Sequence, residues 1–424
     1  MSVMWEKFAW ELPALCCVKN KAIARFSFFL ILAMGSVFVQ AHPYQPTDQN
    51  QQGDTGAPIC GADRFKMWLP ALKGKKIALM VNPTSRVGRM HLVDFMRKKK
   101  VKVEVIFAPE HGFRGEAEAG EEIRDGRDAV TGIKVISLYG KNLMPKPGQL
   151  TGLDAVVFDI QDVGVRFYTY LSSLHYMMQA CADQNIPLWV LDRPNPNGHF
   201  VDGPILDTAY RSFVGMHPIP VVHGMTLGEL ARMIQGEGWL NTSTTCSLTV
   251  VPVAHYRRSQ RYDLPVPPSP NLPDARSVAL YPSICFFEGI DASLGRGTAK
   301  PFQVVGAPWF LGGDTTFTPR AIPGKSNNPP YRDVPCGGLN FTHLSVDDIR
   351  STARLWLDPL WLFCEQGRER PGFFLPFFDK LAGNALWREG ILRGESEAEV
   401  RSGWSSALDE FRRRRAPYLL YPDE

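Results

Sequence analysis

The amino-acid sequence predicts an α/β protein in which a parallel sheet domain is followed by a smaller α+β domain. Three observations support this fold class. Up to about residue 240, apolar runs of strand length alternate with stretches of helical spacing, which is typical of a parallel sheet covered by helices on both faces. After residue 240, proline-rich and glycine-rich loops dominate. The chain of 424 residues is also long enough for two domains.

The elements predicted for the first domain, residues 61–240, alternate regularly along the chain. The strands are KKIALMVN (75–82), VKVEVIFA (101–108), IKVISLY (133–139), DAVVFDI (154–160) and PLWVLD (187–192). The helices are HLVDFMRKKK (91–100), YLSSLHYMMQACADQ (170–184) and TLGELARMIQGEGWL (226–240). The run DAVVFDI is apolar almost throughout, as expected of a strand that is buried on both faces.

The second domain, residues 241–424, is predicted to be less regular. LTVVPV (248–253) has the pattern of a strand, and the stretch from there to residue 340 is predicted to consist mainly of loops. DDIRSTARLWLDPLWLF (347–363) and GWSSALDEFRRRR (403–415) are predicted helices. We therefore expect an α+β domain that packs against the first domain.

The N-terminus has the layout of a secretory signal peptide. Three basic residues between positions 19 and 25 precede a short apolar run, and a small-residue cleavage pattern ends at Ala41. Residues 1–41 are the predicted signal peptide, and residues 42–60 are a predicted linker. We expect the protein to be exported to the periplasm or the extracellular space. The alternative is an uncleaved segment that anchors the chain to the membrane.

No sequence motif indicates a cofactor or a metal. GxGxxG and GxxxxGK[ST] are absent, which disfavours dinucleotides and nucleoside triphosphates. HExxH is absent, and the eight cysteines form no CxxC pair. The net charge of +4 gives no reason to expect a nucleic-acid partner. We therefore expect a protein without cofactor or metal.

Three acidic loops, 109–112, 159–164 and 192–196, each follow a predicted strand. Loops at the carboxyl ends of parallel strands converge in space and commonly form ligand sites. Carboxylates, amides, arginines and aromatic rings together suit a carbohydrate, because acids transfer protons, amides bind hydroxyls and rings pack on sugar faces. The loops therefore predict a saccharide site at this edge of the sheet.

Glu110 is the predicted general acid/base of this site. The alternative is an ion pair with Arg114, four residues further on, or a cap on the following turn. Asp159 and Asp162 are candidates for a second catalytic carboxylate, or for orienting an N-acetyl group of the substrate. The alternative for both is that they brace the loop by hydrogen bonds.

A series of strings resembles one bacterial family in content and order. The strings are FAPEHGFRG, SLYG, VFDIQDVGVRFYTY, LDRPNPNG, HGMTLGELA, PSPN, YPSICFFEG, GRGTAKPF and YLLY. They are similar to those of the NamZ-type exo-β-N-acetylmuramidases, glycoside hydrolase family 171. The resemblance implies a Rossmann-like N-terminal domain, a smaller C-terminal domain and an active-site cleft between them. It also implies release of N-acetylmuramic acid from non-reducing ends of peptidoglycan fragments.

N-acetylmuramic acid carries a lactyl carboxylate, so its pocket should contain a cation, and the planar fork of arginine suits a carboxylate best. Arg166, Arg193 and Arg296 are candidates, of which we rank Arg166 first. The full set of predicted substrate-binding residues is His111, Arg114, Gln161, Arg166, Tyr168, Asp192, Arg193, Asn195, His223, Glu288 and Arg296. For each, the alternative is a structural role, such as a brace between Asp192 and Arg193 or core packing by Tyr168.

Three residues depart from the family pattern. Ile290 and Asp291 stand where the family usually has a Thr-Asn pair, and Lys300 stands where it often has an acid. These departures leave open a second function, that of a non-catalytic envelope protein that binds peptidoglycan saccharides. A third interpretation is hydrolysis of another acidic N-acyl sugar or ester. In each case the expected partners are saccharides, and the membrane is reached only through an uncleaved signal segment.

Overall fold

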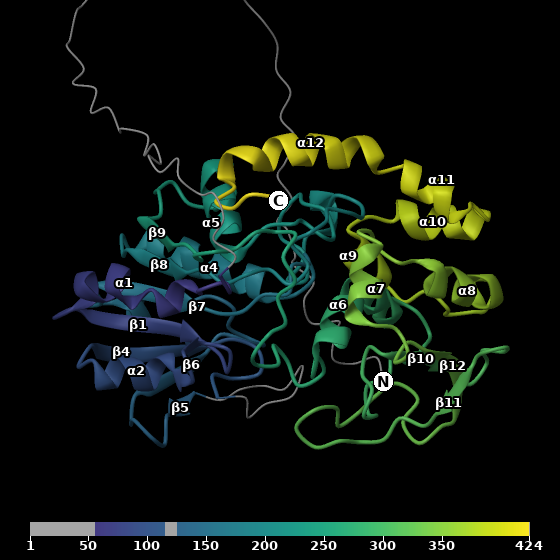
Figure 1. Ribbon diagram of the computed structural model, residues 1–424, viewed down its shortest axis with the longest axis horizontal. Coiled ribbons are helices and arrows are strands. Elements are labelled where there is room, and N and C mark those ends of the chain that lie inside the picture. Colours follow the sequence, from purple (N-terminus) through teal and green to yellow (C-terminus); the bar gives the residue numbers. More distant parts are fainter. Residues whose placement is uncertain (1–55, 115–124, 424) are drawn as a thin grey trace, which may run out of the picture. The chain divides into compact units, whose positions relative to one another are not determined.

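The computed structural model describes residues 56–114 and 125–423 (Figure 1). The predicted signal peptide and most of the predicted linker lie outside these described residues. The last linker residues are part of the fold, because Ile59 forms a β-bridge with Ala254. No helix within the described ranges is both long enough and apolar enough to span a membrane.

A seven-stranded sheet forms the first half of the fold. Its order is β5-β6-β4-β1-β7-β8-β9, and every neighbouring pair is parallel except β5 with β6. The strands are β1 (Lys76–Val81), β4 (Lys102–Ala108), β5 (Gly126–Arg127), β6 (Lys134–Ser137), β7 (Ala155–Asp159), β8 (Leu188–Leu191) and β9 (Leu248–Val251). All five strands predicted for the first domain are present, which confirms the parallel α/β class.

Strand alternation builds a hydrophobic core on each face of this sheet. Ile77 and Leu79 of β1 belong to the cluster that contains Trp68 of α1 (Phe65–Leu72). Ala78 and Met80 belong to the larger cluster, which contains the buried residues of the helices on the other face. The remaining elements of this half are β2 (Arg86–Val87), β3 (Met90–His91), α2 (Leu92–Lys98), α3 (Pro147–Leu150), α4 (Tyr170–Asp183) and α5 (Leu227–Gly236), with 3-10 turns at Gly61–Asp63 and Thr208–Tyr210.

The placement of LTVVPV in the second domain was wrong. Residues Leu248–Val251 form β9, which pairs in parallel with β8 at the edge of the first sheet. The helix α5 supplies the crossover between these two strands, as a parallel pair requires. The first sheet therefore extends beyond the predicted boundary at residue 240.

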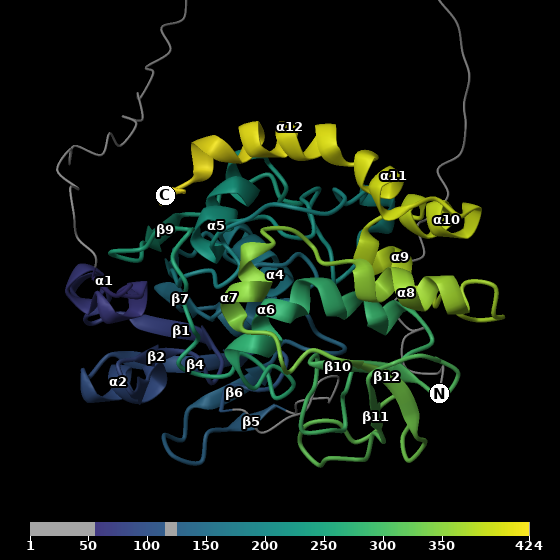
Figure 2. The same cartoon turned by 45° about the vertical axis from the view of Figure 1, so that its right-hand side comes forward.

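The second half contains more regular structure than predicted. The stretch expected to be loops includes a helix, a 3-10 turn and an antiparallel sheet of order β10-β12-β11 (Figure 2). Its elements are α6 (Ala275–Ile284), η4 (Cys285–Gly289), β10 (Val304–Ala307), β11 (Thr315–Phe317) and β12 (Cys336–Asn340). Six helices and a 3-10 turn follow among the described residues. They are α7 (Val346–Ser351), α8 (Asp358–Gly367), α9 (Phe377–Ala382), α10 (Leu386–Arg393), α11 (Glu397–Ser402), α12 (Ser405–Arg415) and the turn at Ala416–Tyr418.

The helix predicted over residues 347–363 is in fact two helices, α7 and α8. Ala353 adopts a positive φ of 45°, which ends the helical backbone. The backbone N–H of Leu355 then donates to the buried carboxylate of Asp202 at 2.8 Å instead of to a helical carbonyl. A tertiary hydrogen bond thus overrides the local helical pattern.

The C-terminal segment returns to the first sheet and fastens the two halves together. The hydroxyl of Tyr421 donates to Oδ2 of Asp192 at 2.5 Å, directly after β8. Arg258 pairs with the buried Glu229 of α5 at 2.5 Å and also donates to the carbonyl of Tyr421 at 2.8 Å. The YLLY string therefore has a structural role, because it closes the fold over the end of α5.

Candidate active site

Glu110 stands at the carboxyl end of β4, in a turn that follows the strand at once. His111 and Gly112 have φ angles of 69° and 72°, so two successive residues adopt the left-handed conformation. Glycine adopts this conformation without a steric penalty, which explains Gly112 in this turn. The turn leaves Glu110 half-buried at the sheet edge, whereas only 7% of His111 is exposed.

Two hydroxyl groups hold the carboxylate of Glu110. Thr169 donates through Oγ1 to Oε2 at 2.9 Å, and the hydroxyl of Tyr139 also hydrogen-bonds to this carboxylate. Thr169 precedes α4, and Tyr139 lies just after β6, so both come from the same edge of the sheet. Burial raises the pKa of Tyr139, and the negative charge of Glu110 raises it further, so Tyr139 stays a hydrogen-bond donor.

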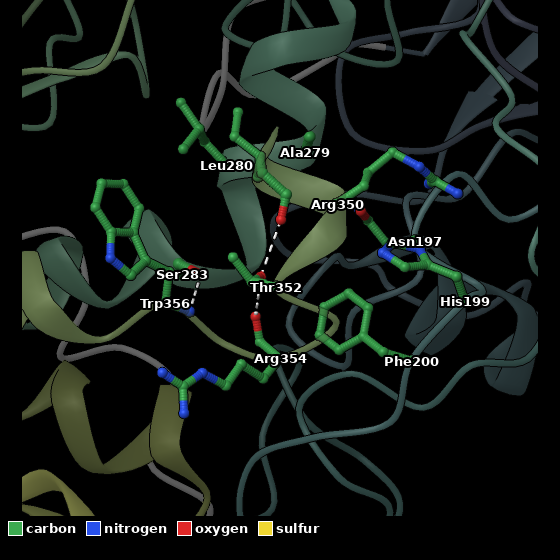
Figure 3. Close-up of a pocket in the computed structure, with 11 residues that line it drawn as sticks. Asn197, His199, Phe200, Ala279, Leu280, Ser283, Arg350, Thr352, Arg354 and Trp356 are labelled. Carbon is green, nitrogen blue, oxygen red and sulfur yellow. Dashed lines mark hydrogen bonds between the residues drawn. The ribbon is translucent and has the colours of Figure 1, made fainter. Parts of the chain in front are cut away.

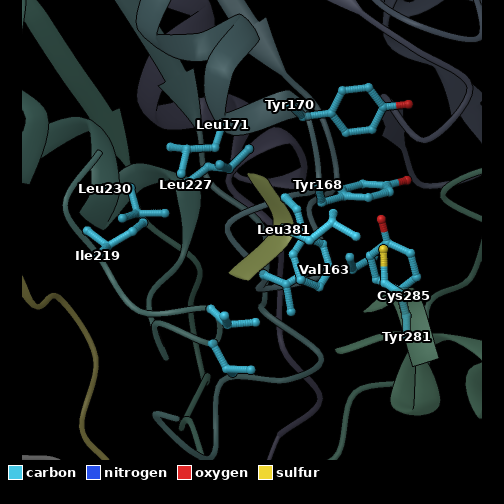
Figure 4. Packing of buried hydrophobic residues seen from close by; sticks show 14 of the residues in the cluster. Val163, Tyr168, Tyr170, Leu171, Ile219, Leu227, Leu230, Tyr281, Cys285 and Leu381 are labelled. Carbon is cyan, nitrogen blue, oxygen red and sulfur yellow. The ribbon is translucent and has the colours of Figure 1, made fainter. Parts of the chain in front are cut away.

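The rings of Tyr168, Tyr170 and Tyr281 pack against one another close to Glu110. The rings of Tyr168 and Tyr170 lie edge to face at 5.0 Å, and those of Tyr168 and Tyr281 at 5.7 Å (Figure 4). The Tyr168 hydroxyl donates to the carbonyl of Pro268 at 2.8 Å. Only 8% of Tyr168 is exposed, which contradicts the predicted stacking of its ring on a sugar. The core-packing alternative describes Tyr168 correctly.

Asp162 lies near Tyr168 and Tyr170 and is the strongest candidate for a second carboxylate. Its Oδ2 accepts the backbone N–H of Gly164 at 2.7 Å, while Oδ1 is buried and has no hydrogen-bond partner within the described part of the chain. Burial raises the pKa of Asp162 to about 7. Burial raises the pKa of Tyr168 and Tyr170, and the charges of Asp162 and Glu110 raise both further, so both acids lie near these rings.

The second half of the chain contributes an ion pair to this region. Nη2 of Arg296 donates to Oε1 of Glu288 at 2.6 Å, and the two side chains are 22% and 25% exposed. The Arg296 guanidinium also lies over the ring of Phe302 at 5.1 Å. The charges of Arg296 and Glu288 both influence the pKa of Tyr139, so the pair lies near the hydroxyl that holds Glu110.

These contacts define the candidate active site as five partly exposed polar side chains. They are Glu110, Tyr139, Thr169, Glu288 and Arg296. The neighbouring aromatic residues Tyr168, Tyr170 and Tyr281 are buried. A carboxylate held by hydroxyl donors, beside an arginine, suits proton transfer on an anionic ligand.

Asp159 and Arg193 form a buried ion pair, which contradicts the catalytic role predicted for Asp159 and the substrate contact predicted for Arg193. The guanidinium donates to both oxygens of Asp159, at 2.6 and 2.9 Å. Its Nη2 also donates to the carbonyl of Arg86. Asp159 has no exposed surface and Arg193 is 7% exposed, so the pair braces two neighbouring loops.

Arg166, ranked first for the lactyl carboxylate, is a structural residue instead. Its two terminal nitrogens donate to four backbone carbonyls, those of Pro204, Ile219, Leu381 and Ala382, at 2.7 to 2.8 Å. Only 1% of the residue is exposed. The guanidinium ties the first half of the fold to α9 and has no terminal N–H left for a substrate.

Arg114 also serves the fold. It forms ion pairs with Asp128 at 2.9 Å and with Asp94 at 3.2 Å. The ion pairs of Arg114 are thus with these two aspartates and not with Glu110, and they favour a structural role for Arg114. The sequence spacing of four residues suggested a local pair, but the turn after β4 is not helical and points the two side chains to different partners.

Four more predicted binding residues are buried and engaged in internal hydrogen bonds. Gln161 donates to the carbonyl of Pro194 at 2.7 Å, and Asn195 donates to that of Met225 at 2.9 Å. Asp192 accepts from Thr226, Gly228 and Tyr421, and Nδ1 of His223 accepts from the N–H of Met225. Thr226 and Glu229 also form the capping box of α5. The internal hydrogen bonds of the four predicted residues favour the structural alternative, in which they shape the loops around the site.

Tyr139 and Thr169 are site residues that the sequence analysis did not select. Tyr139 ends the strand candidate IKVISLY, so its place at a strand terminus was a usable signal. Thr169 stands between two tyrosines directly before a predicted helix, where threonine usually indicates a helix cap. Its side chain makes no cap hydrogen bond and points to Glu110 instead.

A small cavity lies elsewhere, between the loop after β8, helix α6 and the α7–α8 connection (Figure 3). Asn197, His199, Ser283, Arg350 and Trp356 are among its lining residues, and no predicted site residue lines it. In the described ranges, no group of three or more His, Cys, Asp or Glu is placed to hold a metal ion.

Comparison with known proteins decides the family. Residues 77–276 match the model for the N-terminal part of the exo-β-N-acetylmuramidase NamZ, and residues 279–421 match the model for its C-terminal part. The chain belongs to the NamZ family. This confirms the resemblance seen in the sequence motifs. Glu110, Tyr139 and Thr169 lie in the N-terminal model, and Glu288 and Arg296 lie in the C-terminal model, so the candidate site combines both parts of the family.

Relatives of known sequence or structure extend over most of the chain. The peptidoglycan β-N-acetylmuramidase NamZ of Bacillus subtilis (strain 168) is 38% identical over 415 residues, which cover 93% of this chain and 99% of that protein. The crystal structure of a DUF1343 family protein from Bacteroides fragilis NCTC 9343 has a TM-score of 0.81 and 45% identity, and covers 87% of this chain and 100% of its own. The crystal structure of a second DUF1343 family protein from the same strain has a TM-score of 0.72 and 28% identity, and covers 86% of this chain and 99% of its own.

Proposed function

We propose that this protein is an exo-acting β-N-acetylmuramidase, which releases N-acetylmuramic acid from the non-reducing ends of peptidoglycan fragments during cell-wall turnover. Family membership and the Bacillus subtilis relative support the substrate class. The observation that carries the proposal in the structure is the half-buried carboxylate of Glu110, held by two hydroxyl groups at the edge of the sheet.

Glu110 is the proposed general acid. Cleavage of a glycosidic bond requires a proton on the leaving oxygen as the bond to the anomeric carbon breaks. A carboxyl group can deliver this proton only if it is held in one orientation. Thr169 binds one oxygen of Glu110 at 2.9 Å and Tyr139 also binds the group, so its orientation is fixed before substrate enters.

Asp162 is the proposed second carboxylate. Its Oδ1 is buried without a partner among the described residues, and its Oδ2 is fixed by the N–H of Gly164. A buried carboxyl group whose pKa is raised to about 7 can exchange a proton near neutral pH. This role fits either a base that activates water or a group that orients the N-acetyl substituent of the substrate.

The departure at Asp291 leaves the candidate site intact. Trp309 donates to a carboxylate oxygen of Asp291 at 3.2 Å, and the hydroxyl of Tyr331 donates to the other. Asp291 thus supports the local fold of the second half, while Glu288 and Arg296 remain partly exposed. This observation favours the hydrolase over the non-catalytic saccharide-binding alternative.

We also propose that the protein is exported, with residues 1–41 as the signal segment. The basic residues before a short apolar run, and the small-residue pattern ending at Ala41, support this proposal. Fractionation of cells that express the full chain tests it. N-terminal sequencing of the exported protein then distinguishes a cleaved segment from an uncleaved anchor.

The function is tested with the disaccharide N-acetylmuramyl-β-1,4-N-acetylglucosamine. Mass spectrometry and proton NMR should detect free N-acetylmuramic acid, and the first-formed anomer reports the stereochemistry. Glu110→Gln should abolish release while retaining binding. Glu104→Gln is the matched control, because Glu104 is an exposed acid on the same strand, paired with Lys102 at 2.9 Å. Intact disaccharide with the unmodified protein at every pH would contradict the proposal.

A further inference from the structure

We propose that Arg296, held in place by Glu288, binds the lactyl carboxylate of N-acetylmuramic acid and so determines the specificity of the site. This inference rests on the proposed function. It assigns one side chain to the chemical group that distinguishes N-acetylmuramic acid from N-acetylglucosamine. It also reverses the order of candidates that the sequence indicated.

The three candidate arginines differ in the number of N–H donors that remain for a ligand. Arg166 donates to four backbone carbonyls, and Arg193 is paired with both oxygens of Asp159. Arg296 makes a single hydrogen bond, from Nη2 to Glu288, with the residues that the structure describes. Its other N–H groups therefore remain for a carboxylate, which guanidinium binds through two parallel hydrogen bonds.

Arg296 also lies near the residues that hold the proposed proton donor. Arg296 lies close enough to Tyr139 for its charge to lower the pKa of that hydroxyl group, and Tyr139 binds Glu110. In N-acetylmuramic acid the lactyl ether is on carbon 3, on the same ring as the scissile bond at carbon 1. A cation in the neighbourhood of the proton donor therefore suits this sugar, and Arg296 approaches Tyr139 from the second half of the chain.

The guanidinium of Arg296 is held in place before a ligand binds. Glu288 fixes one end of the guanidinium at 2.6 Å, and the ring of Phe302 lies under its face at 5.1 Å. The side chain therefore loses little conformational freedom when a ligand binds. Glu288 also offsets the charge of Arg296 while the site is empty. A lysine would carry the same charge but would lack the planar edge that a carboxylate needs.

The test compares two chromogenic substrates on a set of variants. One substrate is the N-acetylmuramic acid β-glycoside, and the other is the same glycoside with its lactyl carboxylate converted to the amide. For Arg296→Gln we expect kcat/KM to fall roughly 10- to 100-fold on the first substrate, as for loss of a charged hydrogen bond, and much less on the second. On the first substrate, kcat/KM of Arg296→Lys should lie between the values of the unmodified protein and of Arg296→Gln. Glu288→Gln should mainly raise KM for this substrate.

Arg320→Gln serves as the control variant, because Arg320 is 71% exposed and pairs with Asp333 at the surface. An equal loss on both substrates with Arg296→Gln would overturn the inference. Binding measured by calorimetry keeps the test independent of turnover. In the Glu110→Gln background, Arg296→Gln should reduce the preference for N-acetylmuramic acid over N-acetylglucosamine, and an unchanged preference would also overturn it. Failure of the unmodified protein to release product would contradict the proposed function instead.

Discussion

The Oγ1 atom of Thr169 lies 2.9 Å from Oε2 of Glu110, although 59 positions separate the two residues in the sequence. The contact joins the turn after β4 to the residue that precedes α4. It also explains why Thr169 makes no cap hydrogen bond to its own helix. The hydrogen bond indicates that the role of Thr169 is to orient the carboxyl group of Glu110.

Removing this hydroxyl should slow catalysis. We expect Thr169→Val to lower kcat by roughly 10-fold, because a hydrogen bond that orients the carboxyl group of Glu110 is lost, with a smaller effect on KM. Thr169→Ser keeps the hydroxyl and should retain most of the activity. Steady-state kinetics on an N-acetylmuramic acid glycoside make the comparison. Equal kcat values for Thr169→Val and the unmodified protein would argue against the orienting role.

Asp162 should make the stability of the protein fall as pH rises, in comparison with its asparagine variant. Burial raises the folded-state pKa of Asp162 to about 7, above the ordinary value of 3.8. Such a group stabilises the fold below its unfolded pKa, and this contribution is lost as pH rises through the folded pKa. The melting temperature of Asp162→Asn relative to the unmodified protein should therefore increase from pH 4 to pH 8. A constant difference across this range would show that Asp162 does not titrate as described.

The buried histidines His175 and His217 should have the opposite effect. Their rings are joined by a 3.0 Å hydrogen bond, and burial lowers the pKa of His175 to about 4 and that of His217 well below the ordinary value of 6.5. The unfolded state then binds protons more readily than the folded state, so stability is full above pH 6.5 and falls as pH drops through the folded pKa. Urea unfolding at pH 7 and pH 5 should show this loss. His175→Asn/His217→Gln should be less stable at pH 7 but depend less on pH.

Arg166 should prove essential to the fold and not to substrate recognition. Arg166→Met leaves four buried carbonyls without donors, which should cost about 3 kcal/mol or more of unfolding free energy. Chemical denaturation measures this cost. For the fraction that remains folded, we expect KM for an N-acetylmuramic acid glycoside within a few-fold of the unmodified protein. A large, selective rise in KM with unchanged stability would restore Arg166 as a substrate ligand.

Five strands and three helices of the first half followed from hydrophobic periodicity, because each of them buries an apolar face. The short elements α1, α3, β2, β3 and β5 were not predicted. The three loops were also placed at the correct edge of the sheet. The individual roles were harder to predict, since Asp159, Arg166 and Arg193 have the residue types of a site but are paired inside the fold. Their partners are distant in sequence, and Leu381 in particular lies 215 positions from Arg166. Sequence pattern carries no information about such contacts.

The regular structure between residues 275 and 340 was missed for a related reason. The strand β12 contains the glycines Gly337 and Gly338, which lower strand propensity. A Cβ at Gly338 would collide with the carbonyl oxygen of Val305 on β10, so close strand packing requires glycine there. The glycines that made this segment resemble a loop in the sequence are therefore the residues that allow its strands to pack closely.

The measurement that tests the central claim most directly is release of N-acetylmuramic acid by the unmodified protein and by Glu110→Gln from N-acetylmuramyl-β-1,4-N-acetylglucosamine. Our account predicts release by the unmodified protein, and a loss of at least about 100-fold in kcat for Glu110→Gln, as expected when a general acid is removed. Calorimetry should show that the variant still binds the disaccharide. Near-normal turnover by Glu110→Gln would contradict the assignment of Glu110 as the proton donor.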